Sequence, residues 1–305
     1  MANLVFEFHY DCDLSKPGVV DVLQQSLIDL SPRFAAAMQV TDVDRDPAPL
    51  DVNAVEPHAL SLAILEKGLT RGETYAKLAA ESPGRYPRPF GHATVHGGID
   101  SMYLRVAFDA YTPAHPIGSK WLWSNTIGGR IERNEVDGLP SHEWLDQLAC
   151  VLAAQAHFLW GGAFLHDEFL ARNLHSGPDG TYAIGRDIRQ SLPGLYWLNA
   201  FGAPYVTLIG PERFRALGAS ANTADGGAKI VTVYGRPDQW DSKQGRHRHR
   251  EVLDHLGRQY FFDRSNPQAA TTAPDYGLPE LGPDRALQAV VSDDGTTFTI
   301  IPDST

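Results

Sequence analysis

Four side chains near the middle of the chain could do chemistry: His166, Asp167, Glu168 and, nine positions after His166, His175. Imidazole and carboxylate groups bind zinc and transfer protons, so a metal-dependent or His/Asp hydrolase is one interpretation. The spacing differs from that of the H-E-x-x-H helix, which places two imidazoles and a carboxylate around one zinc ion. This difference favours the alternative, a polar end of a strand over residues 162–169.

Two further histidines, His92 and His96, lie in a segment expected to be a strand. At four residues apart, both lie on one face of the strand, with Cα atoms about 13 Å apart. Without a bend, this distance is too long for both to bind one metal ion. We therefore predict ordinary sheet-face histidines and no metal site.

One basic run occurs in the chain, Arg246-His247-Arg248-His249-Arg250, with Lys243 close by. It predicts the solvated start of a helix, or a contact with an acidic partner whose strength depends on histidine protonation. The run is short and belongs to an acidic protein, which argues against nucleic-acid binding.

Signatures of nucleophilic and nucleotide-dependent catalysis are absent from the sequence. It contains no G-x-S-x-G, no P-loop and no G-x-G-x-x-G motif. Cys12 lies between Asp11 and Asp13, whose carboxylates raise a thiol pKa and disfavour a reactive thiolate. Cys150 lies near the apolar stripe of an expected helix and is predicted to be a core residue. The sequence thus predicts no catalytic residues and no cofactor.

The charge of the 305-residue chain is unevenly distributed. The formal net charge is −11, and residues 1–60 carry ten acidic and three basic residues, a net −7. Phosphate contacts need a basic surface, so a nucleic-acid partner is disfavoured. An acidic surface steers a basic protein partner towards it, although acidity also serves solubility alone.

Composition and termini indicate a globular protein of the cytoplasm. Hydrophobic residues make up 43% and charged residues 21% of the chain, which is typical of a folded domain. The N-terminus lacks the basic and apolar regions of a signal peptide, and no apolar run reaches membrane-spanning length. With only two cysteines, no disulfide framework is expected.

The periodicity of apolar residues predicts an α+β fold with mostly antiparallel sheets and packed helices. The repeated order of strands, long helix and further strands suggests two similar α+β halves within a single unit, residues 1–305. That unit has an acidic N-terminal segment, 1–60, and a Pro-rich tail with a terminal hairpin, 264–305. Strands are expected at residues 4–9, 91–97, 102–109, 120–126, 129–135, 162–169, 195–201, 229–234, 287–291 and 296–301, and helices at 17–30, 142–159, 204–209, 211–217 and 250–257.

Residues 193–214 form the densest aromatic segment. Aromatic side chains bury large apolar areas, so a core element is expected here. Alternation puts apolar residues on both faces of residues 195–201, as in a central strand that is covered on both sides.

Several of these segments together resemble bacterial immunity proteins of polymorphic-toxin and type VI secretion systems. The resemblance spans about residues 60–260 and includes the long helix at 142–159. It rests on Glu66-Lys67-Gly68-Leu69-Thr70-Arg71, Phe90-Gly91-His92, Leu122-Trp123-Ser124-Asn125-Thr126-Ile127 and Pro193-Gly194-Leu195-Tyr196-Trp197-Leu198-Asn199-Ala200-Phe201-Gly202. It implies a protein that binds and blocks a cognate toxin by occlusion, with no chemistry of its own.

Tryptophan and tyrosine dominate the energetics of protein interfaces, and carboxylates would complement a basic toxin such as a nuclease. The residues expected to bind the toxin are therefore Trp121, Trp123, Tyr196, Trp197, Trp240, Asp42, Asp44 and Asp46. Two alternatives stay open: the hydrolase described above, and a structural subunit of a larger assembly.

Overall fold

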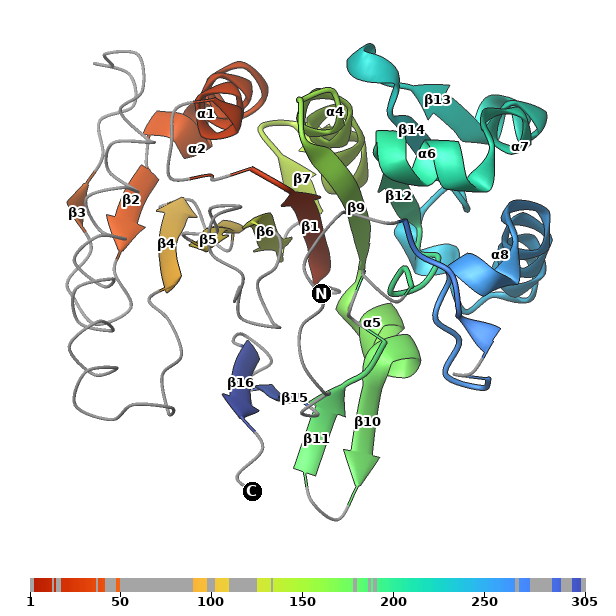
Figure 1. Ribbon diagram of the computed structural model, residues 1–305. Helices are drawn as coiled ribbons and strands as arrows, with labels where there is room; N and C mark the ends of the chain where they lie inside the picture. The colour runs from red at the N-terminus through yellow and green to blue at the C-terminus, as the bar shows by residue number, and fades with distance from the viewer. Residues whose placement is uncertain are drawn as a thin grey trace.

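A computed structural model gives the three-dimensional structure of the chain (Figure 1). The residues that it describes are 3–12, 14, 18–36, 38–41, 48–49, 90–97, 102–109, 125–132, 134–177, 180–185, 188, 191–266, 269–274, 287–291 and 298–302. The predicted acidic residues Asp42, Asp44 and Asp46, and the predicted tryptophans Trp121 and Trp123, lie outside them.

Ten strands form one sheet in which every neighbouring pair is antiparallel, in the order β13-β14-β12-β9-β1-β6-β5-β4-β2-β3. The strands are β1 (Leu4–Tyr10), β2 (Met38–Thr41), β3 (Ala48–Pro49), β4 (Phe90–Gly97), β5 (Met102–Asp109), β6 (Asn125–Ile131), β9 (Phe158–Leu165), β12 (Leu198–Phe201), β13 (Ala221–Thr223) and β14 (Lys229–Thr232). With helices packed on this sheet, the predicted α+β class is confirmed. Strands from residues 4–131 and from residues 158–232 share the sheet, so the suggested halves are not separate sheets.

The first strand, β1, lies in the interior of the sheet, between β6 and β9. Its burial alternates strictly, with Leu4, Phe6, Phe8 and Tyr10 buried. The hydroxyl of Tyr10 donates a hydrogen bond of 2.9 Å to the Leu152 carbonyl. The N-terminal segment therefore supplies a central strand and is built into the core of the fold.

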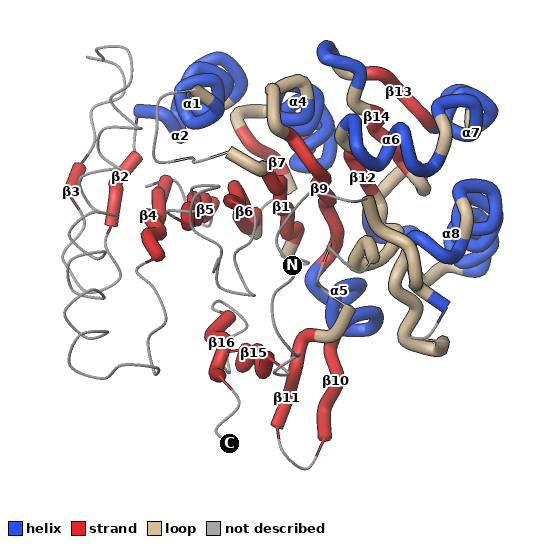
Figure 2. The backbone as a smooth tube through the Cα atoms, viewed as in Figure 1, coloured by secondary structure: helices blue, strands red, loops and turns tan. Residues whose placement is uncertain are grey.

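Helices cover the sheet in layers (Figures 1 and 2). On one side lie α1 (Val19–Leu30), α2 (Pro32–Ala36) and α4 (Ser141–Ala153), and on the other side lies α5 (His166–Asn173). At the β13 end of the sheet are α6 (Ala203–Ile209), α7 (Pro211–Ala216) and α8 (Lys243–Leu256). Short 3-10 turns are η1 (Gly218–Ser220), η2 (Asp225–Gly227), η3 (Pro237–Gln239) and η4 (Arg258–Tyr260).

Three two-stranded ribbons complete the described elements: β7 (Glu135–Val136) with β8 (Leu139–Pro140), β10 (Leu174–Gly177) with β11 (Gly180–Ala183), and β15 (Leu287–Val291) with β16 (Phe298–Pro302). The last ribbon confirms the predicted terminal hairpin. Among the described helices, none combines the length and the apolarity needed to cross a bilayer.

Two predicted boundaries near the middle of the chain are wrong. A turn was expected at Gly128-Gly129, but β6 runs through both glycines and pairs with β1 and β5. The helix expected over 142–159 ends at Ala153, and residues 158–165 form β9. All eight residues of β9 are buried, so its apolar run reflects a strand covered on both faces rather than one helical stripe.

The start of α8 was also predicted too late, at residue 250. The helix begins at Lys243 because the Ser242 side chain accepts a hydrogen bond from the backbone N–H of Gly245, at 2.9 Å. A serine in this position satisfies an otherwise unpaired helical donor. The basic run therefore lies in the first half of the helix, which confirms the prediction of a helix start, although that start comes earlier than residue 250.

The aromatic stretch is a core element, as predicted. Residues 191–202 are all buried, and β12 pairs with β9 on one side and β14 on the other. The strand itself is shorter than predicted and begins at Leu198.

Gly202, which ends the aromatic stretch, gives the first testable prediction. A Cβ at this position would lie 2.0 Å from the Phe158 carbonyl oxygen, a backbone atom that cannot rotate away. We expect Gly202→Ala to lower the free energy of unfolding by about 2 kcal/mol, through overpacking. Gly235→Ala is the control, because its Cβ would meet only the Gln239 side chain, at 3.6 Å. Equal urea midpoints for the two variants would contradict this prediction.

Candidate functional site

Three aromatic residues predicted to bind a partner have described side chains. Tyr196 is fully buried and Trp197 is 2% exposed, so the prediction that they anchor a partner is wrong for this fold. Their rings fill the core, where Tyr196 packs against Phe164 at a centroid distance of 4.3 Å. Trp240 is half-buried and packs against the core. Of the three, Trp240 alone reaches the surface.

The predicted hydrolase residues fall on α5 rather than at the end of a strand. His166 is half-buried with its ring 6.4 Å from that of Phe169, Asp167 is exposed, and Glu168 is fully buried. Burial lowers the pKa of His166. Residues two apart on a helix point about 200° away from each other, so His166 and Glu168 do not face one site. The side chain of His175 lies outside the described part of the chain.

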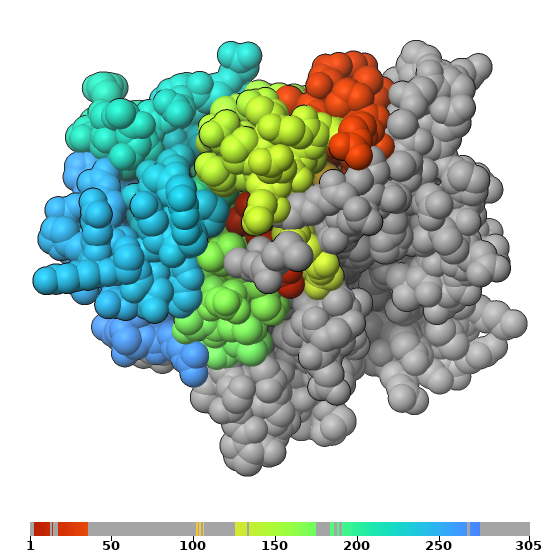
Figure 3. Space-filling view, turned by 180° about the vertical axis from the view of Figure 1, so that it is seen from behind, coloured from red at the N-terminus to blue at the C-terminus, as the bar shows by residue number. Residues whose placement is uncertain are grey.

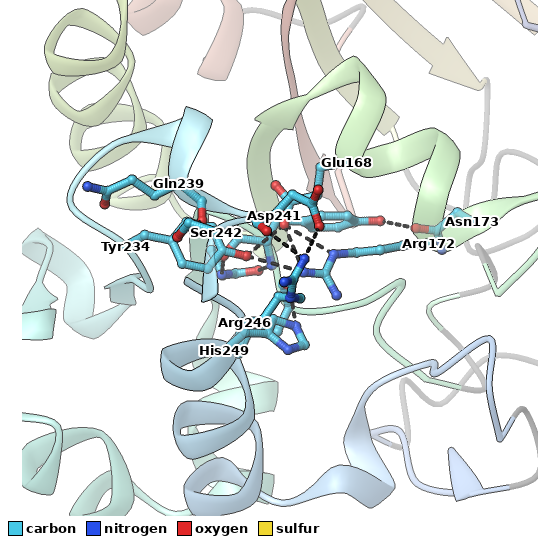
Figure 4. Close-up of polar contacts among 12 residues, drawn as sticks. Glu168, Arg172, Asn173, Tyr234, Gln239, Asp241, Ser242, Arg246 and His249 are labelled. Atoms are coloured by element: carbon cyan, nitrogen blue, oxygen red, sulfur yellow. Dashed lines mark hydrogen bonds and ion pairs between the residues drawn. The ribbon is translucent and has the colours of Figure 1, made fainter. Parts of the chain in front are cut away.

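Glu168 is instead the centre of a buried ion pair (Figure 4). Its Oε1 accepts hydrogen bonds from Arg172 Nε at 3.1 Å and from the Tyr234 hydroxyl at 2.7 Å. Burial raises the pKa of Glu168, and the charge of Arg172 and the hydrogen bond from Tyr234 oppose this shift. Burial also raises the pKa of Tyr234, with a further contribution from the Glu168 charge. The phenol therefore stays protonated and donates to the carboxylate.

Amide groups extend this network through the aromatic stretch. The Asn173 side chain donates to the carbonyls of Ile184 and Pro193, and its oxygen accepts from the Tyr196 hydroxyl at 2.6 Å. The Asn199 side chain bonds both backbone groups of Tyr196, at 2.9 and 3.0 Å. These bonds fix a segment of irregular backbone that is completely buried, where unpaired polar groups would be costly.

His249 joins α8 to the same network. Its Nε2 lies 3.0 Å from the Leu195 carbonyl oxygen. Burial, and secondly the positive charge of Arg172, lower its pKa to about 3. The imidazole is therefore neutral at physiological pH and donates to Leu195. Asn173 thus ties α5 to the aromatic stretch and His249 ties α8 to it, while Glu168 and Arg172 tie α5 to Tyr234.

The face of the sheet opposite α1 and α4 carries a second cluster of polar side chains, which the sequence analysis did not predict. Glu7 and His9 of β1 lie there, each 14% exposed, with Glu7 Oε2 3.8 Å from His9 Nε2. His9 Nδ1 is 3.3 Å from the Thr126 hydroxyl, and its ring lies 5.5 Å from that of Trp160. Arg130, two residues beyond Gly128 on β6, is ion-paired with Glu132.

Strand register places further polar residues in line with this pair. Thr126, Gly128 and Arg130 of β6 pair with Ala107, Arg105 and Tyr103 of β5. On the next strand, β4, His92 pairs with Ala107 and His96 pairs with Tyr103. Residues that pair directly across strands share one face of a sheet. The predicted sheet-face histidines thus share a face with Glu7 and His9. The signal was present in the sequence, because β1, β4 and β5 each alternate polar with apolar residues.

Comparison with known proteins adds little to this description. No family model and no curated protein matches the chain. Among solved structures, a T6SS protein of Pseudomonas aeruginosa aligns over 92% of this chain and 90% of its own, with 10% sequence identity and a TM-score of 0.47. A likeness at this level assigns neither a family nor an activity.

Proposed function

We propose that this protein is an immunity-type protein of the bacterial cytoplasm, which binds a cognate toxin and blocks it by occlusion without a reaction of its own. The proposal carries forward the resemblance seen in the sequence. Its physical basis is the acidic N-terminal segment, whose net charge of −7 would attract a basic toxin such as a nuclease.

The observation that supports it most is the way this segment is built into the fold. It contributes the interior strand β1 and the helix α1, so the acidic residues that the structure describes in this segment lie on or beside rigid elements. Asp29 is exposed on α1, and Asp11 is exposed where β1 ends. Side chains held on rigid elements lose less conformational entropy when a partner binds. A charged surface held in this way favours fast association with an oppositely charged partner.

Exchange of one of these charges tests the proposal. The candidate toxin for this test is the product of a neighbouring gene, and the first measurement is survival of cells that express both. With the purified pair, Asp29→Lys is expected to slow association about fivefold at low salt, because charge steering acts on the on-rate. Asp225→Lys makes the same change of charge at an exposed position in η2 and serves as the control. Unchanged killing by the toxin in the presence of wild-type protein would contradict the proposal.

The two alternatives make different predictions. The hydrolase requires His166, Asp167, Glu168 and His175 to converge, and stoichiometric zinc, iron or manganese in purified protein would support it. Among the described residues, no three metal-ligating side chains form a group that could hold an ion. A structural subunit would elute in size-exclusion chromatography as part of a stable assembly, whereas an immunity-type protein would form its complex only with the toxin.

A further inference from the structure

Helix α8 and its neighbour α7 form the basic end of an acidic protein. Residues 211–258 carry nine basic and six acidic residues, a net +3 in a chain of net −11. The exposed cations there include Lys243 and Arg250 on α8 and Arg215 on α7. Figure 3 shows the blue region of the chain at one side of the molecule, with side chains that project outwards.

Most charges on α8 are already paired. Arg246 Nη1 lies 2.6 Å from Asp241 Oδ1, and Arg258 Nε lies 2.5 Å from Asp254 Oδ1. Glu251 contacts both His247, at 3.2 Å, and Arg248, at 3.4 Å.

Lys243 and Arg250 differ, since neither has an ion pair or hydrogen bond within the described part of the chain. Seven residues separate them, which puts them about 10 Å apart along one side of the helix. Neither forms an ion pair, although the charge of Arg250, after the hydrogen bond from Arg258, contributes to the lowered pKa of Asp254, one turn further along the helix. Two cations at this spacing form an extended contact rather than a single-ion site.

The helix is also held rigidly from behind. Arg213 of α7 donates to the Leu256 carbonyl at 2.7 Å, and Arg248 donates to the Ser220 hydroxyl at 2.9 Å. His249 bonds Leu195, and Val252 and Leu256 are completely buried. The side of α8 that carries Lys243 and Arg250 is therefore held in a fixed position, which lowers the entropic cost of binding.

We propose that the outward side of α8, with Lys243 and Arg250 as its main contacts, is a docking surface for an acidic segment of a partner protein. This surface goes beyond the toxin-binding function proposed above, which uses acidic residues of the N-terminal segment. A short acidic segment meets only the local charge, because exposed charges more than about 8 Å away are screened at physiological salt. A DNA duplex extends past the patch and meets the acidic remainder of the protein, so it fits less well.

Fluorescence anisotropy with a labelled ten-residue polyglutamate peptide tests the proposal on the full chain. We expect salt-sensitive binding that the double variant Lys243→Gln/Arg250→Gln weakens at least fivefold. The control, Arg33→Gln/Arg236→Gln, removes the same charge from α2 and from the residue before η3, where both arginines are more than 60% exposed and ion-paired within the fold. It is expected to change affinity less than twofold. Equal melting temperatures would show that both variants are folded.

Three results would contradict the proposal of a docking surface. The first is no binding of the peptide by wild-type protein at millimolar concentration. The others are equal weakening by the two double variants, and tighter binding of a DNA duplex of the same charge. Toxin neutralisation is measured separately. If Lys243→Gln/Arg250→Gln loses the peptide and still neutralises the toxin, the two surfaces act independently. If the toxin test fails while the peptide binds, only the function proposed from the N-terminal acidity is lost.

Discussion

Replacement of Glu168 by alanine is expected to lower the free energy of unfolding by about 3 kcal/mol. The change removes the acceptor for Arg172 and Tyr234 and leaves both donors in a site where Glu168 itself is fully buried. Arg172 then keeps its charge without a partner in a site where its side chain is only 24% exposed, and such a loss is among the more destabilising single changes. Urea denaturation followed by tryptophan fluorescence measures the effect.

The neighbouring residue provides the control for that experiment. Asp167 is exposed on the same turn of α5, so Asp167→Ala should change stability by no more than about 0.5 kcal/mol. Glu168→Gln keeps an acceptor for Tyr234 and should fall between the two. Equal stability of Glu168→Ala and Asp167→Ala would mean that the ion pair does not support the fold.

Acid should destabilise the protein through His249. Its pKa is about 3 in the folded chain, where burial and Arg172 disfavour the charged form, and about 6.5 when unfolded. Between these values the unfolded chain binds a proton that the folded chain does not. Stability is therefore complete above pH 6.5 and falls as the pH drops towards 3, by up to about 1.4 kcal/mol per pH unit.

Comparison with a variant isolates this effect from other titrations. Glu168 acts in the opposite direction, since its raised pKa makes the folded chain bind a proton first. His249→Gln keeps a donor for the Leu195 carbonyl but cannot titrate, so its stability should depend less on pH between 6.5 and 4. His247→Gln, at an exposed position on the same helix, should retain the wild-type dependence. If the stability of wild type and of His249→Gln depended on pH in the same way, the assignment of this pH dependence to His249 would be contradicted.

Local periodicity was enough to predict much of the fold. Partial alternation of apolar and polar residues over 4–9 and 102–109 matched β1 and β5, and the proline-initiated helices α6 and α7 were placed within one residue. At Gly128-Gly129 and over residues 158–165, tertiary pairing decided against a local signal, whereas the missed start of α8 reflects the local cap at Ser242. Gly128 and Gly129 resemble a turn, yet they lie inside β6 because β1 and β5 pair with them on both sides.

The candidate sites were harder to predict, because burial depends on which segments meet. The aromatic density of residues 193–202 signals a core element but does not say whether Trp197 reaches the surface. Glu168 resembles a catalytic carboxylate in sequence, and only its contacts with Arg172 and Tyr234, a residue 66 positions away, show that it is structural. The pairing of Glu7 and His9 with Thr126 likewise requires knowledge of the strand order.

The interior position of β1 has a consequence for synthesis of the protein. The first strand to leave the ribosome pairs only with residues 125–131 and 158–165, so its edges stay open until more than 160 residues have been made. At roughly 5–20 residues per second, that wait lasts about 8–30 seconds. Its exposed Phe6, Phe8 and Tyr10 are then a substrate for chaperones, and nascent chains stopped before residue 125 should aggregate rather than fold.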